Sequence, residues 1–228
     1  MWIEAIWFGL ALVIFSMLYQ YLQTRTVTIS TIQFACSFAG IILSDLSFIL
    51  SGLSYFWRIG IRKLGHRKQY GVVGFVLVLI HAILSLQLYA GGIFSLSLYK
   101  TAPLTFISSL IALAIFTMMV GVSNWGMPAR LGAVLWRRLL RIGYIGIILF
   151  TIHLTLLRYA AWIEWLKTFN PFLPPQSLFL FLFSVTTVGL RIALYVSLWK
   201  KKSQTKNQPP SINNQPLPPS QVTVPPQS

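Results

Sequence analysis

Acidic residues are almost missing from this chain of 228 residues, which has 3 Asp and Glu against 18 Lys and Arg. In a soluble protein the formal charge of +15 would favour binding to nucleic acid. Only 9% of the residues are charged, however, and 56% are hydrophobic. A soluble domain cannot bury that much apolar surface, so the composition predicts a multi-pass membrane protein whose partner is the lipid bilayer and not a nucleic acid.

Cysteine is also scarce, because Cys36 is the single one and lies within an apolar run. An internal disulfide is therefore excluded, and there is no Cys-x-x-Cys motif for zinc, an iron–sulfur cluster or covalent haem attachment. The glycine-rich patterns of nucleotide-binding loops are missing as well. Any nicotinamide or flavin must therefore be supplied by a partner protein.

Six apolar runs are long enough to cross a bilayer, which takes a helix of about 20 residues. They cover approximately residues 3–22, 30–55, 71–92, 103–123, 142–163 and 176–199. Because the runs are long and do not alternate in polarity, they predict helices and not a barrel. We expect an all-α bundle of six transmembrane helices over residues 1–202 and a disordered Pro/Gln/Ser-rich tail over residues 203–228.

Basic residues gather in three segments, between the second and third runs, between the fourth and fifth, and after the sixth. The positive-inside rule places these segments in the cytoplasm. Both termini are then expected to be cytoplasmic, in a plasma or inner membrane. Glu4 before the first run and Arg25 after it favour the reverse orientation. The three basic segments contain more charges, so we let them decide the predicted orientation.

Two histidines lie inside apolar runs, His81 in the third and His153 in the fifth. Gly71 precedes His81 by ten residues and Ile142 precedes His153 by eleven. Each distance is a helical rise of about 15 Å, so both imidazoles are expected at matched depth near the bilayer midplane. One haem iron needs two such nitrogen ligands. Hydrogen-bonded histidines that join neighbouring helices are the other interpretation of the pattern.

Three further charges lie within or beside the apolar runs, namely Asp45, Arg158 and Arg191. Charges in a bilayer are costly and usually paired, so Asp45 and Arg191 are expected to form an ion pair between the second and sixth runs. In a functional alternative, Arg191 binds a haem propionate and Asp45 relays a proton in quinone chemistry. We expect Arg158 either to bind an outward propionate or to reach the membrane interface.

The segments that lead to both histidines resemble the ferric reductase-like transmembrane domain. The first is Leu64-Gly-His-Arg-Lys-Gln-Tyr-Gly71, followed by the apolar run to Ile80-His81. The second is Arg130-Leu-Gly-Ala-Val-Leu-Trp136-Arg-Arg-Leu-Leu-Arg141-Ile-Gly-Tyr144, which leads to His153. The resemblance covers residues 36–160, and the family includes ferric reductases, NADPH oxidases and the haem subunit of the bacterial methionine sulfoxide reductase system.

This resemblance implies a b-type haem protein that passes electrons, an oxidoreductase component with a separate flavoprotein or quinol as donor. Ferric iron, a quinone or a periplasmic reductase subunit would accept the electrons. Two-haem members carry a second histidine about 13 or 14 residues along each ligand helix. The corresponding positions here are Arg67, Lys68, Phe94, Ser95, Leu139, Leu140, Leu166 and Lys167. One haem b, held by His81 and His153, is therefore expected.

Two alternatives stay open at this point. One is a haem-free transporter or membrane scaffold in which the polar residues join helices. The other is a quinone-linked haem subunit of a periplasmic reductase.

Overall fold

A computed structural model describes residues 1–58, 61–89, 102–123 and 126–206 of the chain. These residues form α1 (Trp2–Thr24), α2 (Ile29–Trp57), the 3₁₀ helix η1 (Ile61–His66), α3 (Arg67–Tyr89), α5 (Pro103–Ser123), α6 (Met127–Thr168) and α7 (Gln176–Lys206). Six helical spans are long and apolar enough to cross a membrane, and the described residues contain no strand. The predicted all-α membrane fold is therefore confirmed.

The chain divides into two compact units, Met1–Ile192 and Ala193–Ser228. The division falls inside α7, whereas the sequence predicts a boundary after residue 202. α7 continues to Lys206, so the segment predicted as tail begins with helical residues. The rest of the predicted tail lies outside the described residues. All features discussed below belong to the first unit.

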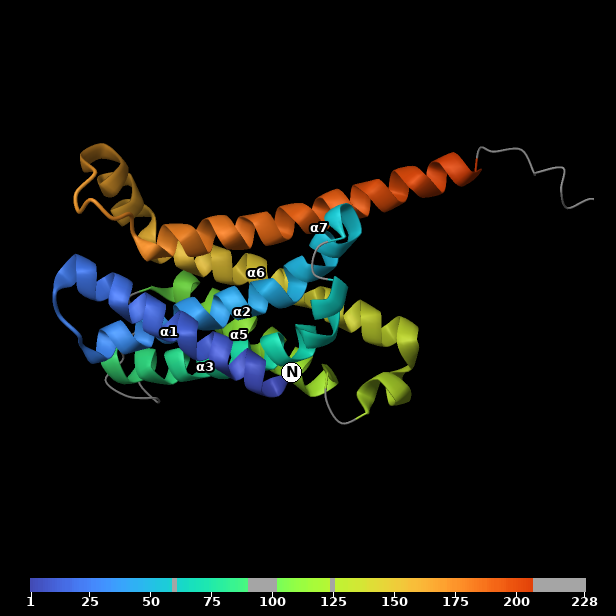
Figure 1. The fold of residues 1–228 in the computed structure, drawn as a ribbon, viewed down its shortest axis with the longest axis horizontal. Helices are drawn as coiled ribbons and strands as arrows, with labels where there is room; N and C mark the ends of the chain where they lie inside the picture. Colours follow the sequence, from blue (N-terminus) through green and yellow to red (C-terminus); the bar gives the residue numbers. More distant parts are fainter. Residues whose placement is uncertain (59–60, 90–101, 124–125, 207–228) are drawn as a thin grey trace, which may run out of the picture. The chain divides into compact units, whose positions relative to one another are not determined.

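α2 is the central helix of the first unit, beside α1 and α3 (Figure 1). It supplies residues to all three clusters of buried hydrophobic side chains, including Ile41, Leu43 and Phe48. Small residues such as Ala39 and Gly40 allow the neighbouring helices to approach it closely. Lipid tails are as apolar as these side chains, so close packing and hydrogen bonds, and not exclusion of water, hold such helices together.

Two helical hairpins, α2–α3 and α5–α6, provide the most extensive packing. In the first hairpin, a Cβ atom at Gly74 would lie 2.7 Å from the carbonyl oxygen of Gly40, so both glycines are needed for the close approach. In the second hairpin, Gly146 lies against Ile115 and Phe116 of α5. These glycines therefore serve helix packing.

Both hairpins turn at the same end of the unit, which we call the basic end because it holds Arg67, Lys68 and the arginines of the first part of α6. The other end, where α2 and α5 begin, is the distal end. The basic segment between the fourth and fifth predicted runs is part of α6, which is kinked at Gly132 (φ 73°). Glu4 of α1 contacts Nε2 of His66 at 2.8 Å, so the N-terminus lies at the basic end. The side of the membrane that this end faces stays a prediction.

Candidate functional site

His81 is held by the main chain of the central helix. Its Nδ1 lies 3.0 Å from the carbonyl oxygen of Gln33. A carbonyl oxygen can only accept a hydrogen bond, so Nδ1 carries the proton and donates it. In the neutral imidazole the lone pair is then on Nε2.

A small polar network surrounds this ring. Nε2 of the Gln33 side chain donates to Oγ of Ser85 at 2.6 Å, and the Ser85 hydroxyl donates to the carbonyl oxygen of His81 at 2.7 Å. Ser85 Oγ lies 3.5 Å from His81 Nε2, which is at the limit of a hydrogen bond, and its proton is already used. Nε2 of His81 therefore keeps its lone pair available.

His153 has the same arrangement in the second hairpin. Its Nδ1 donates to the carbonyl oxygen of Thr105 at 2.9 Å. The ring centroid lies 6.3 Å from that of Phe150, a buried residue of the largest hydrophobic cluster. Backbone and core packing thus orient this imidazole with Nε2 as the basic nitrogen.

The two histidine sites are equivalent positions of a repeat. Each histidine lies 48 residues after the residue whose carbonyl oxygen it contacts. His153 follows His81 by 72 residues, and the same offset relates Thr105 to Gln33 and the pair Gly143 and Gly146 to Gly71 and Gly74. In both hairpins these glycines face the partner helix, Gly71 near Ser47 and Gly143 near Met119. Comparing the sequence with itself at this offset would have revealed the repeat before the structure did.

The histidines share one level of the bundle, which is near the first turns of α2 and α5. Gln33 lies in the second turn of α2 and Thr105 in the first turn of α5, so both sites are near the distal end. α3 begins at Arg67, four residues earlier than the sequence predicts, which puts His81 about 21 Å of helical rise from that first residue. A charge on one of the two imidazoles would act on the other.

Of the two arginines considered as propionate partners, only Arg158 lies near this level. Its guanidinium carbon is 5.9 Å from the ring centroid of Phe34, the neighbour of Gln33. Arg191 instead lies 5.1 Å from the ring centroid of Tyr144. Tyr144 precedes His153 by nine residues, a rise of about 14 Å toward the basic end. The structure therefore separates Arg191 from the histidines.

The predicted ion pair between Asp45 and Arg191 is not formed among these described residues. Asp45 is 1% exposed, and its Oδ2 accepts a hydrogen bond from Ser184 Oγ at 2.6 Å. Its Oδ1 has no hydrogen-bond partner in the described part of the chain. Both residues lie where predicted along the chain, but Asp45 faces the hydroxyl of Ser184 on α7 and Arg191 faces an aromatic ring. The expected pairing of Asp45 with Arg191 was wrong, because the rotation of each helix about its axis turns the two side chains toward different neighbours.

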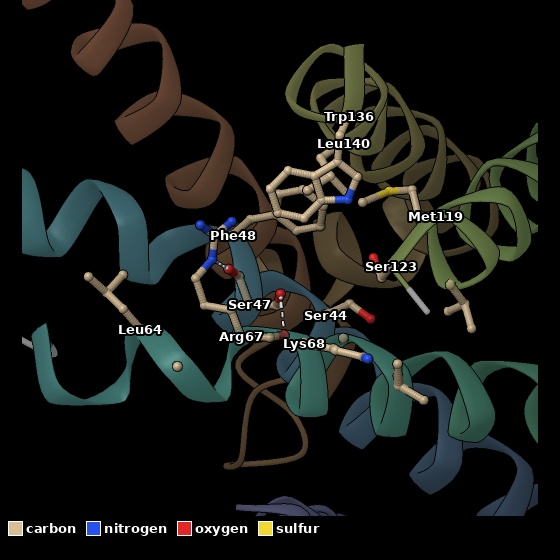
Figure 2. A pocket seen from close by; sticks show the side chains of 14 residues that line it. Ser44, Ser47, Phe48, Leu64, Arg67, Lys68, Met119, Ser123, Trp136 and Leu140 are labelled. Carbon is tan, nitrogen blue, oxygen red and sulfur yellow. Dashed lines mark hydrogen bonds between the residues drawn. The ribbon is translucent and has the colours of Figure 1, made fainter. Parts of the chain in front are cut away.

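A cavity of about 260 Å³ lies between the two hairpins at the basic end (Figure 2). Its lining includes Lys68 and Leu140, which are 13 residues before His81 and His153 and are equivalent in the repeat. Leu64 and Trp136 form a second equivalent pair in the lining. The family resemblance puts a second histidine pair at these two positions. In this chain the positions hold the amine of Lys68 and the alkyl side chain of Leu140.

The distal site offers two neutral histidines, each supported at Nδ1 by a carbonyl oxygen. Nε2 is then the basic nitrogen of each ring, which is the tautomer that a metal ion would require. Among the described residues, no group of three or more His, Cys, Asp or Glu side chains is placed to hold a metal ion.

No family model matches this chain, and no curated protein matches it either. The resemblance to the ferric reductase-like domain therefore stays a prediction.

Proposed function

We propose that this membrane protein is an electron carrier that holds one b-type haem between His81 and His153. The observation that supports this proposal most directly is the repeated histidine–carbonyl pair. Two hairpins with the same internal spacing present the same nitrogen, Nε2, from two imidazoles at one level of the bundle. His81 and His153 would hold the haem iron, and a repeat that supplies one imidazole from each hairpin would suit a centre with two protein ligands.

The side chains of this protein would contribute binding, orientation and charge balance. The Gln33 carbonyl and the Thr105 carbonyl set the orientation and tautomer of the two rings. Neutral imidazoles carry no charge into the bilayer, so the ligands themselves avoid the cost of a buried cation. Arg158 near Phe34 is the cation best placed to neutralise a propionate. When bound, the haem supplies one-electron transfer.

The donor and the acceptor are separate molecules in this proposal. The chain has no glycine-rich nucleotide motif, so electrons come from a flavoprotein or from a quinol in the membrane. Ferric iron, a quinone or a periplasmic reductase subunit takes them. The protein is then an oxidoreductase component that works through partners.

One observation favours a second candidate, a haem-free transporter or scaffold. Each histidine already joins the two helices of its own hairpin through a hydrogen bond to the main chain. Such bonds between membrane helices are worth about 1 kcal/mol and need no cofactor to explain them.

An absorption spectrum of the purified full-length protein, recorded before and after dithionite, separates the two candidates. We expect a haem spectrum in the wild type with about one haem per chain, and its loss in both His81→Ala and His153→Ala. His66→Ala is the matched control, because this histidine lies at the basic end and contacts Glu4. A colourless wild type with normal helical content, prepared from cells supplied with haem, would contradict the electron-carrier proposal and support the second candidate.

A further inference from the structure

The basic end of the first unit contains a group of cations around the cavity. Arg67 and Lys68 line it, and Arg67 is within electrostatic range of Arg191. Arg67 donates from Nε to the carbonyl oxygen of Ser47 at 2.6 Å, which holds its guanidinium inside the bundle. Figure 2 shows Arg67 and Lys68 diverging from adjacent positions of α3, Arg67 toward Phe48 and Lys68 toward Ser44.

Among the described residues, the structure shows no ion pair between an acidic side chain and Arg67 or Lys68. The chain has 3 acidic residues in all, Glu4, Asp45 and Glu164. Glu4 contacts His66, and Asp45 accepts from Ser184 and is fully buried. Glu164 lies near the distal end of α6, eleven residues after His153. Cations gathered at a cavity without an internal counter-ion create a local potential that attracts an external anion.

The cavity also presents an unused hydrogen-bond donor. The Nε1 atom of Trp136 is buried and has no hydrogen-bond partner among the described residues. Leaving such a group without a partner costs about 1–3 kcal/mol, so a ligand that accepts its hydrogen bond is favoured. The other walls are mostly apolar, with Leu64, Val72 and Leu140 among them, and suit the carbon atoms next to an anionic group.

We propose that this cavity binds a phosphate group, with Lys68 and Arg67 as the cations and Trp136 Nε1 as a neutral donor. Phosphate oxygens accept hydrogen bonds from both kinds of group, and charge-assisted bonds to them are among the strong ones. The phosphate group has two possible sources, the headgroup of an anionic phospholipid and free phosphate in solution. The site is independent of any haem at the distal end.

The test uses full-length protein in a neutral detergent and chloride buffer. Native mass spectrometry measures binding of phosphatidylglycerol and phosphatidylcholine, and calorimetry measures binding of inorganic phosphate. Lys68→Gln removes one cation at an exposed position, and Trp136→Phe removes the donor but keeps an aromatic ring. Arg138→Gln is the matched control, since it removes an exposed cation of α6 that does not line the cavity.

We expect saturable binding of one phosphatidylglycerol per chain, weakened about five- to ten-fold by Lys68→Gln and unchanged by Arg138→Gln. Trp136→Phe should weaken binding by a smaller factor. If inorganic phosphate binds with the same dependence on Lys68, the proposal holds and the source is soluble. The proposal fails if neither probe binds saturably, or if Arg138→Gln weakens binding as much as Lys68→Gln, because the effect would then belong to the general surface charge.

Discussion

The two hairpins share one plan but differ in what surrounds it. In α2–α3 more than half of the residues of the first helix are buried, and a side-chain network of Gln33 and Ser85 supports the histidine. In α5–α6 the first helix has three buried residues, Ser108, Ala112 and Phe116, and a backbone carbonyl supports the histidine. The common part is the glycine pair and the histidine on the second helix.

This difference separates the requirements of the site from those of the fold. The elements that occur in both hairpins are an imidazole, a carbonyl oxygen at its Nδ1, and glycines that bring the helices together. Three elements occur in the first hairpin alone: the Gln33–Ser85 network, the contact with α1, and the basic pair Arg67 and Lys68. The second hairpin has Leu139 and Leu140 at the positions equivalent to that pair. The repeated features position the two imidazoles, and the unrepeated ones belong to local packing or to a separate site.

The largest effect is expected from completing the repeat at the basic end. The double variant Lys68→His and Leu140→His places two imidazoles 13 residues before the natural pair, on opposite sides of one cavity. The haem content should rise from about one to about two per chain. Pyridine haemochrome assays against protein concentration measure it. Each single variant serves as a control and should keep about one haem per chain. A double variant that also keeps about one haem per chain would refute the equivalence of the basic-end positions and the histidine positions.

Substituting the glycines tests how rigid each hairpin is. A Cβ atom in Gly74→Ala meets the main-chain oxygen of Gly40, which cannot move away, and we expect a loss of about 1–3 kcal/mol in stability. Gly143→Ala meets side-chain atoms of Met119 and Phe48, of which methionine can adapt, so the loss should be smaller. Thermal unfolding followed by circular dichroism compares them. Gly121→Ala, with nothing within 4 Å, is the control, and equal melting temperatures for all three variants would contradict this packing.

Removing the network around His81 should loosen its ligand without removing it. Gln33→Ala keeps the carbonyl that accepts from Nδ1 and deletes the bond to Ser85. We expect about a ten-fold weaker retention of haem, measured by transfer to apomyoglobin. Thr105→Ala is the equivalent change in the other hairpin and should have no effect, because its contribution is the backbone oxygen. Equal effects of the two variants would show that the network has no special role.

The smallest effect is expected from the contact that ties the first hairpin to α1. Glu4→Gln weakens the contact with His66, which involves a carboxylate that is 42% exposed. Partly exposed ion pairs contribute about 0.2–1 kcal/mol, so the melting temperature should fall only slightly. Glu164→Gln on the second hairpin should leave it unchanged. A fall of the same size in both variants would assign the effect to net charge.

The histidine pair shows how far the sequence leads toward the site. Two histidines in two apolar runs with similar offsets from basic segments are enough to predict a shared level, and the structure puts both near the distal end. α3 begins earlier than predicted, because Arg67 and Lys68 join the helix instead of preceding it. The depth of the histidines in the bilayer stays a prediction. A charged residue extends a helix when its group finds a partner, as Arg67 does at Ser47, and a hydropathy pattern does not contain that information.

The sequence alone determined that this chain has six apolar helices with basic segments between them, since hydropathy and charge are properties of local stretches. It also determined the repeat, because the glycine pair and the histidine recur in the sequence after 72 residues. The tertiary structure alone decided that Asp45 meets Ser184, that Arg191 meets Tyr144, and that a cavity opens beside Lys68. Those outcomes depend on how each helix is rotated and which neighbour it packs against, and packing across the whole bundle sets both.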